Sequence, residues 1–157
     1  MITRLDHVGF AVWELGPAAA LWGHALGGDY RQGGTRYRGF NFLQFAWPQG
    51  GRVELLSPAG DDTGFIAKFL GKHGEGVHHL TLIADDLRAE VSRLRGSGIK
   101  VFAEDYGDPH WMEAFVNVGN RGPRLLVQLA QSTLSVEEQD DVWRRQSLVS
   151  VLELASR

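Results

Sequence analysis

Cysteine is absent from this chain of 157 residues. Its absence excludes disulfide bonds, thiolate metal ligands and a cysteine nucleophile. No apolar run is long enough to cross a bilayer, and the N-terminal residues Met1–His7 lack the apolar region of a signal peptide, so we expect neither a membrane span nor a signal peptide. The formal net charge is only −3, which gives no reason to expect nucleic acid or an anionic membrane as a partner.

The composition is that of an ordinary globular domain. Hydrophobic residues make up 43% of the chain and charged residues 22%, which excludes a disordered polymer. Glycine is abundant, with 20 residues, and indicates many turns between short strands. We therefore expect one cytoplasmic domain that is an enzyme or a binding protein.

The sequence contains an internal repeat. Leu5–Leu15 and Val77–Leu87 are both apolar runs of strand length that end in an acidic residue and leucine. Each is followed by apolar residues at helical spacing. Later segments also match, because Val53–Leu55 corresponds to Val127–Leu129. The repeat predicts two βαβββ modules, neither of which could cover both faces of its sheet alone.

We expect an α+β fold in which the paired modules form a curved mixed sheet around a cleft. The expected parts are a first module at 1–58, a linker at 59–74, a second module at 75–131 and a C-terminal helical extension at 132–157. The two modules together form a single domain, 1–131.

The extension starts with Ser135 and Glu138 at the spacing of a capping box. The pattern after them predicts one long helix that ends near Leu154, with an apolar stripe of Val142, Val149 and Leu152 along one side. The stripe could pack on its own domain or form a contact between two copies, and the sequence leaves both open.

Four polar residues occupy matched positions of the repeat. Side chains alternate along a strand, so His7 and His79 should face the same cleft, as should Glu54 and Gln128. Two imidazoles, a carboxylate and an amide oxygen suit one divalent metal ion such as Zn, Co, Ni, Mn or Fe. A cation also explains why a carboxylate is tolerated in an apolar strand. His78, next to His79, should face the other way.

These segments resemble the vicinal oxygen chelate superfamily (glyoxalase/bleomycin resistance/dioxygenase), and within it the methylmalonyl-CoA epimerase-like branch. The matching segments are Leu5–Val12, Val53–Pro58, Phe65–Leu80 and Leu125–Leu129. The resemblance implies paired βαβββ modules around one metal ion, with the ligands at His7, Glu54, His79 and Gln128. It also implies proton transfer beside a carbonyl group, with the metal stabilising the enolate.

The sequence departs from this family where the epimerases carry the glutamates that move the proton. The last strand has Gln128, whose amide can coordinate through oxygen but cannot accept a proton at neutral pH. The third strand, Gly39–Trp47, contains no carboxylate; Phe42 or a neighbour stands where a glutamate is expected, and Gln44 is the nearest polar residue. The chain is therefore not expected to be a true methylmalonyl-CoA epimerase.

Another group must then handle the proton. The candidate bases are Glu113 and His110 in the second module, and Gln128 and Gln44 are candidate catalytic residues whose amides cannot act as the base. Tyr106 and Asp105 are nearby titratable residues, and a metal-bound water is a further possible base.

Three functions remain open. The favoured one is a divalent-metal-dependent lyase or isomerase that acts beside a carbonyl through an enolate. The second is a non-haem iron dioxygenase that uses His7, His79 and Glu54 as two histidines and one carboxylate. The third is a small-molecule binding protein of the antibiotic-sequestering type. As an enzyme it would take a small-molecule substrate with a carbonyl or vicinal oxygens, and we expect it to act as a homodimer.

Overall fold

The computed structural model describes residues 1–60, 64–117, 125–144 and 146–156. The chain divides into two compact units. Unit 1 consists of Met1–Val8 and His79–Gln139, and unit 2 of Gly9–His78 and Asp140–Arg157. Among the described residues, no helix has the length and hydropathy needed to span a membrane.

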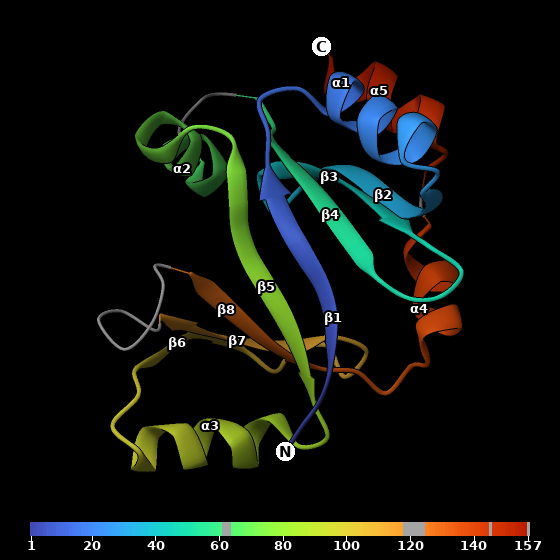
Figure 1. Cartoon of the computed structure of the whole chain (residues 1–157). Coiled ribbons are helices and arrows are strands. Elements are labelled where there is room, and N and C mark those ends of the chain that lie inside the picture. Colours follow the sequence, from blue (N-terminus) through green and yellow to red (C-terminus); the bar gives the residue numbers. More distant parts are fainter. Residues whose placement is uncertain (61–63, 118–124, 145, 157) are drawn as a thin grey trace. The chain divides into compact units, whose positions relative to one another are not determined.

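Unit 1 is a sheet with one helix on it (Figure 1). In sheet order its strands are β1 (Ile2–Ala11), β5 (Gly76–Ala84), β8 (Leu126–Gln131), β7 (Met112–Asn117) and β6 (Val101–Asp105), of which β1 and β5 continue into unit 2. Strands β5 and β8 are parallel, and β8, β7 and β6 are antiparallel. Helix α3 (Leu87–Gly96) begins at Asp86, whose side chain caps it, and buries Leu87 and Val91 against Ala114 and Leu129. Because side chains alternate along β7 and β8, Glu113 and Gln128 lie on the opposite face from α3.

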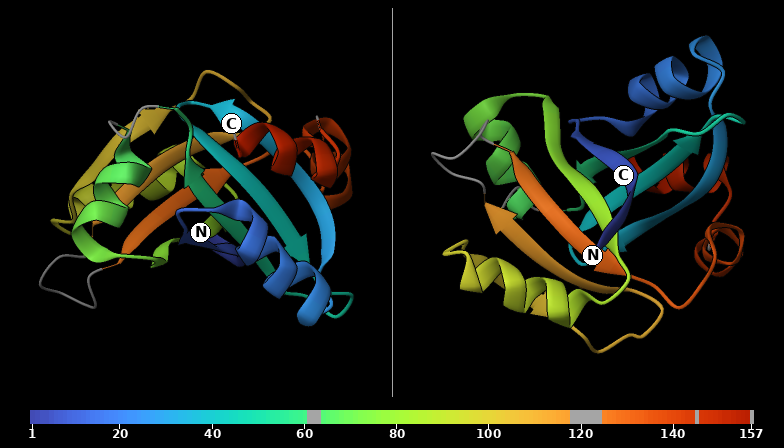
Figure 2. Two further views of the ribbon diagram at one scale, coloured as in Figure 1. Left: turned by 90° about the horizontal axis from the view of Figure 1, so that it is seen from above. Right: turned by 60° about the horizontal axis from the view of Figure 1, so that its bottom comes forward.

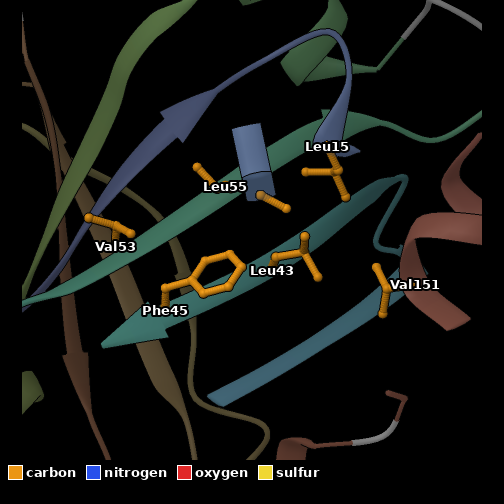
Figure 3. Packing of buried hydrophobic residues seen from close by; sticks show 7 residues of the cluster. Leu15, Leu43, Phe45, Val53, Leu55 and Val151 are labelled. Carbon is orange, nitrogen blue, oxygen red and sulfur yellow. The ribbon is translucent and has the colours of Figure 1, made fainter. Parts of the chain in front are cut away.

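Unit 2 contains a sheet whose order is β2 (Asp29–Tyr37), β3 (Phe40–Ala46), β4 (Arg52–Pro58) and the end of β1, in which β2, β3 and β4 are antiparallel neighbours. Helices α1 (Leu15–Ala19) and α5 (Leu148–Ala155) lie side by side on one face of this sheet (Figures 1 and 2). A π-helix, η1 (Ala20–Ala25), continues α1. The core under these helices is drawn in Figure 3, and its members are Leu15, Ala19, Leu43, Phe45, Val53, Leu55 and Val151.

The α+β class and the paired βαβββ pattern are confirmed, since each copy runs strand, helix and then three strands along the chain. The segment expected to be a linker contains α2 (Phe65–His73). Its Ile66 and Leu70 are buried against Leu56 and Ala11, so this segment is part of the core of unit 2.

The prediction of one long C-terminal helix was wrong. The extension forms α4 (Val136–Trp143) and then α5 as a separate helix. Ser147 starts α5, because its side-chain oxygen accepts a hydrogen bond from the Ser150 backbone N–H. The Tyr30 hydroxyl donates to the Gln146 carbonyl at 2.6 Å and ties the connection to β2. Val151 is fully buried and Leu148 and Leu152 pack beside it, so α5 packs within its own unit, whereas Val142 and Val149 of the expected stripe are exposed.

This packing makes a stability prediction. Val151→Ala removes two buried methyl groups and should lower the free energy of unfolding by about 1–3 kcal/mol. Val149→Ala is the matched control, because Val149 lies on the same helix and is 64% exposed. Urea unfolding of both variants measures the difference. Equal stability of the two variants would show that α5 is not part of the core.

Candidate functional site

Two histidines meet inside unit 1. His7 on β1 and His79 on β5 are both buried, and their Nε2 atoms lie 3.3 Å apart. The rings meet edge to face, at an interplanar angle of 84°. The structure therefore brings together the two imidazoles that occupy matched positions of the repeat.

Asp6 supports His7 and was missed by the sequence analysis. Its carboxylate is buried and accepts a hydrogen bond from His7 Nδ1 at 2.7 Å, while Arg4 forms an ion pair with its other oxygen. This places the proton of the neutral imidazole on Nδ1 and leaves the lone pair on Nε2, the arrangement found in metal-binding histidines. Strict alternation along β1 directs Asp6 away from His7, so the periodicity gave no signal for this contact.

A chain of buried hydrogen bonds leads from Thr81, whose hydroxyl lies against His7, to a carboxylate on β7. The Thr81 Oγ1 lies 3.0 Å from His7 Nε2 and donates to Gln128 Oε1 at 2.6 Å. Gln128 Nε2 in turn donates to Glu113 Oε2 at 2.6 Å. The indole N–H of Trp111 donates to the same Glu113 oxygen at 3.1 Å. Glu113 is 8% exposed, and these two hydrogen bonds hold its carboxylate in a fixed orientation inside the unit.

The strand register places Glu113 at a matched position of the repeat. Glu113 pairs with Ala130 on β8, and Phe42 pairs with Leu56 on β4. Ala130 and Leu56 each lie two residues beyond a predicted ligand position, Gln128 or Glu54. Glu113 is therefore the counterpart, in the second copy, of the position that lacks a carboxylate in the first.

Glu54 belongs to a second polar network, in unit 2. It is half-buried on β4, opposite Gln44 on β3, and accepts a hydrogen bond from Gln44 Nε2 at 2.9 Å. Gln44 Oε1 accepts from Gln32 Nε2 at 2.6 Å and from Arg52 at 3.0 Å. Arg52 forms an ion pair with Asp140 at 2.8 Å. Both ends of the Gln44 amide are thus engaged, which suits a positioning role better than proton transfer.

His78 lies in unit 2, where its ring packs against Phe65 and Phe69 of α2. Burial lowers the pKa of His78, and the nearby charge of Glu54 partly opposes this effect. These contacts agree with a structural role.

The other titratable candidates lie in the exposed connection before β7 and at its borders. His110 is exposed, and its Nδ1 lies 3.0 Å from Thr133 Oγ1. The Tyr106 hydroxyl donates to Glu104, and burial together with that hydrogen bond raises the pKa of Tyr106. Asp105 accepts a hydrogen bond from a backbone N–H in the same loop. The hydrogen bonds described for His110 and Tyr106 do not join the chain that leads to Glu113, whereas Asp105 is the partner of Glu113 in the pairing of β6 with β7.

The unit 1 residues fit a divalent cation chemically. Two imidazole Nε2 atoms face each other, and the amide oxygen of Gln128 is linked to one of them through Thr81. Imidazole nitrogens with carbonyl-type or carboxylate oxygens form a donor set that Zn²⁺, Co²⁺, Ni²⁺, Mn²⁺ and Fe²⁺ accept.

Comparison with known proteins finds a family model and several similar chains. A family model described as the glyoxalase/bleomycin resistance protein/dioxygenase superfamily matches residues 6–115. The ethylmalonyl-CoA/methylmalonyl-CoA epimerase of Cereibacter sphaeroides is 33% identical over 111 residues, which cover 69% of this chain and 80% of that protein. The 4-hydroxyphenylpyruvate dioxygenase of Pseudomonas aeruginosa is 30% identical over 89 residues, which cover 55% of this chain but only 24% of the dioxygenase.

A solved structure shows the same fold. The crystal structure of methylmalonyl-CoA epimerase from Mycobacterium tuberculosis superimposes with a TM-score of 0.74 at 28% sequence identity. The superposition covers 85% of this chain and 90% of that one.

The buried chain of hydrogen bonds predicts a specific cost for removing the Thr81 hydroxyl. Thr81→Val keeps the shape but leaves the buried Gln128 Oε1 without this donor, and should lower the free energy of unfolding by about 1–3 kcal/mol. Thr81→Ser keeps the hydroxyl and should lose less. Urea unfolding compares the three proteins, and a Val variant as stable as the wild type would contradict the hydrogen bonding described.

Proposed function

Because the chain belongs to the glyoxalase/bleomycin resistance protein/dioxygenase superfamily, we propose that it is a divalent-metal-dependent lyase or isomerase that moves a proton beside a carbonyl group. The proposed ligands are His7, His79 and Gln128, completed by Glu54 from unit 2. The observation that carries the proposal is the buried chain of hydrogen bonds from Thr81, which lies 3.0 Å from His7 Nε2, to Glu113. It leads from beside an imidazole suited to a metal to a carboxylate suited to proton transfer.

The metal ion supplies one part of the chemistry. When bound, a divalent cation of this kind stabilises the negative charge that develops on the carbonyl oxygen of the substrate as the neighbouring carbon loses its proton. His7 and His79 would hold it through Nε2, and Asp6 keeps the His7 ring in the required tautomer. The matched positions of Glu54 and Gln128 in the repeat support their inclusion.

Glu113 is the proposed base. The Gln128 amide cannot take a proton at neutral pH, but its Nε2 and the Trp111 indole both donate to Glu113 and fix its orientation. An oriented carboxylate is a competent general base for a proton next to a carbonyl. The base would then stand on β7 instead of at the usual glutamate positions, so we do not expect a true methylmalonyl-CoA epimerase. The proposal includes a small carbonyl substrate and a cytoplasmic homodimer.

One observation favours a second function. The similarity to a 4-hydroxyphenylpyruvate dioxygenase agrees with an iron site formed by His7, His79 and Glu54. In that case the Fe²⁺-loaded protein would consume oxygen with a 2-oxo acid. A lyase or isomerase would instead carry deuterium from the solvent into its substrate without using oxygen.

The ligand assignment predicts loss of metal from two variants. His7→Ala and His79→Ala each remove one Nε2 donor and should lower Co²⁺ affinity by at least about 100-fold relative to the wild type. His24→Ala is the control, because His24 is exposed on η1. Equilibrium dialysis with elemental analysis measures the bound metal. Full occupancy in both variants would remove the basis of the proposal.

The assignment of the base predicts an effect on exchange without an effect on the metal. Glu113→Gln should slow deuterium incorporation from D₂O by at least about 100-fold, because an amide cannot accept the proton. Its metal content should stay unchanged. The assay is NMR on the carbonyl compound that the wild type turns over, found by screening 2-oxo acids and thioesters.

Glu104→Gln is the control for this experiment, since Glu104 lies outside the chain of hydrogen bonds and pairs with Arg95. Exchange at the wild-type rate in the Glu113 variant would show that the base is another group.

A further inference from the structure

A buried cation lies close to one proposed ligand. The side chain of Arg52 is only 8% exposed, and Arg52 and Glu54 lie two residues apart on the same face of β4. Their Cα atoms are therefore about 7 Å apart, a distance that an arginine side chain can span. A buried guanidinium requires an anionic partner, and Glu54 is within its reach.

The partner in the structure is Asp140 instead. Its Oδ1 lies 2.8 Å from the Arg52 Nη1, and its side chain is 13% exposed. The contact is an ion pair rather than a hydrogen bond, because Asp140 Oδ1 accepts no hydrogen bond from the described residues. Asp140 stands on α4, in the C-terminal extension, outside the segment 6–115 that matches the family.

With its charge balanced in this way, Arg52 donates its hydrogen bond to Gln44 Oε1 at 3.0 Å. A guanidinium can only donate, so Gln44 must turn its oxygen toward Arg52 and its Nε2 toward Glu54. Gln32 adopts the same orientation and donates to Gln44 Oε1. This arrangement leaves one acceptor unsatisfied, because the buried Gln32 Oε1 has no hydrogen-bond partner among the described residues. The direction of the Gln44 amide therefore suits both neighbours, because Arg52 can only donate to it and the Glu54 carboxylate can only accept from it.

We propose that Asp140 is a positioning residue for the candidate metal site: it holds the Arg52 guanidinium away from Glu54 and so keeps the Glu54 carboxylate available to the cation. This inference rests on the proposed function, because it takes Glu54 to be a ligand. It gives the C-terminal extension a role in the site that residues 6–115 alone do not supply.

The test removes the charge of Asp140 in the full-length protein. In Asp140→Asn, Arg52 loses its counter-charge and turns to Glu54, so Zn²⁺ affinity should fall at least about 10-fold. In the double variant Asp140→Asn with Arg52→Met, the competing cation is gone, and the affinity should return to within about threefold of the wild type. Asp140→Glu should keep the wild-type affinity. Competition with a chromogenic chelator measures Zn²⁺ binding in each protein.

Glu104→Gln is the matched control, because it breaks an exposed ion pair, with Arg95, and should leave Zn²⁺ binding unchanged. Recovery in the double variant separates competition from a loss of folding, because two lost partners would otherwise be worse than one. A single variant with wild-type affinity, or a double variant no better than the single one, would overturn the inference.

A second measurement needs no metal. The ¹⁵N–¹H resonances of the Gln44 side-chain amide report its hydrogen bond to Glu54 in the metal-free protein. They should shift in Asp140→Asn and stay in place in Glu104→Gln. If the wild type binds no Zn²⁺ but the resonances shift, the proposed function fails and the positioning by Asp140 stands. Unchanged Gln44 resonances in Asp140→Asn would refute the positioning role of Asp140, whether or not the protein binds Zn²⁺.

Discussion

The close approach of two imidazole nitrogens is the constraint on which the rest of the account depends. His7 Nε2 and His79 Nε2 lie 3.3 Å apart in a buried setting, and Asp6 keeps the proton of the His7 ring on the far nitrogen. Lone pairs directed at one point repel each other unless a proton or a cation lies between them. The Thr81 hydroxyl also lies against His7 at this atom, and the chain of hydrogen bonds to Gln128 and Glu113 starts from that hydroxyl.

The two copies of the repeat each pair one glutamine amide with one glutamate carboxylate. In the first copy Gln44 on β3 donates to Glu54 on β4, and in the second Gln128 on β8 donates to Glu113 on β7. The order of amide and carboxylate is reversed between the copies. A last strand without a glutamate therefore need not mean a site without a base, because the carboxylate stands on the neighbouring strand.

Much of the fold was predictable because strands and helices leave periodic signals. The repeat located the βαβββ modules and directed His7 and His79 to the same face, through alternation alone. Contacts that break the period were not predictable. Asp6 reaches His7 from the adjacent position, and Arg52 meets Asp140 from far along the chain. The break in the C-terminal extension depends on a cap and on a tertiary hydrogen bond, which a hydrophobic stripe does not reveal.

X-ray absorption spectroscopy of the Co²⁺-loaded wild-type protein tests the central claim most directly. The account predicts one bound Co²⁺ per chain whose outer-shell scattering requires two imidazole rings, with oxygen atoms completing the first shell. A spectrum fitted by oxygen ligands alone, or by a single imidazole, would show that His7 and His79 do not share a metal ion.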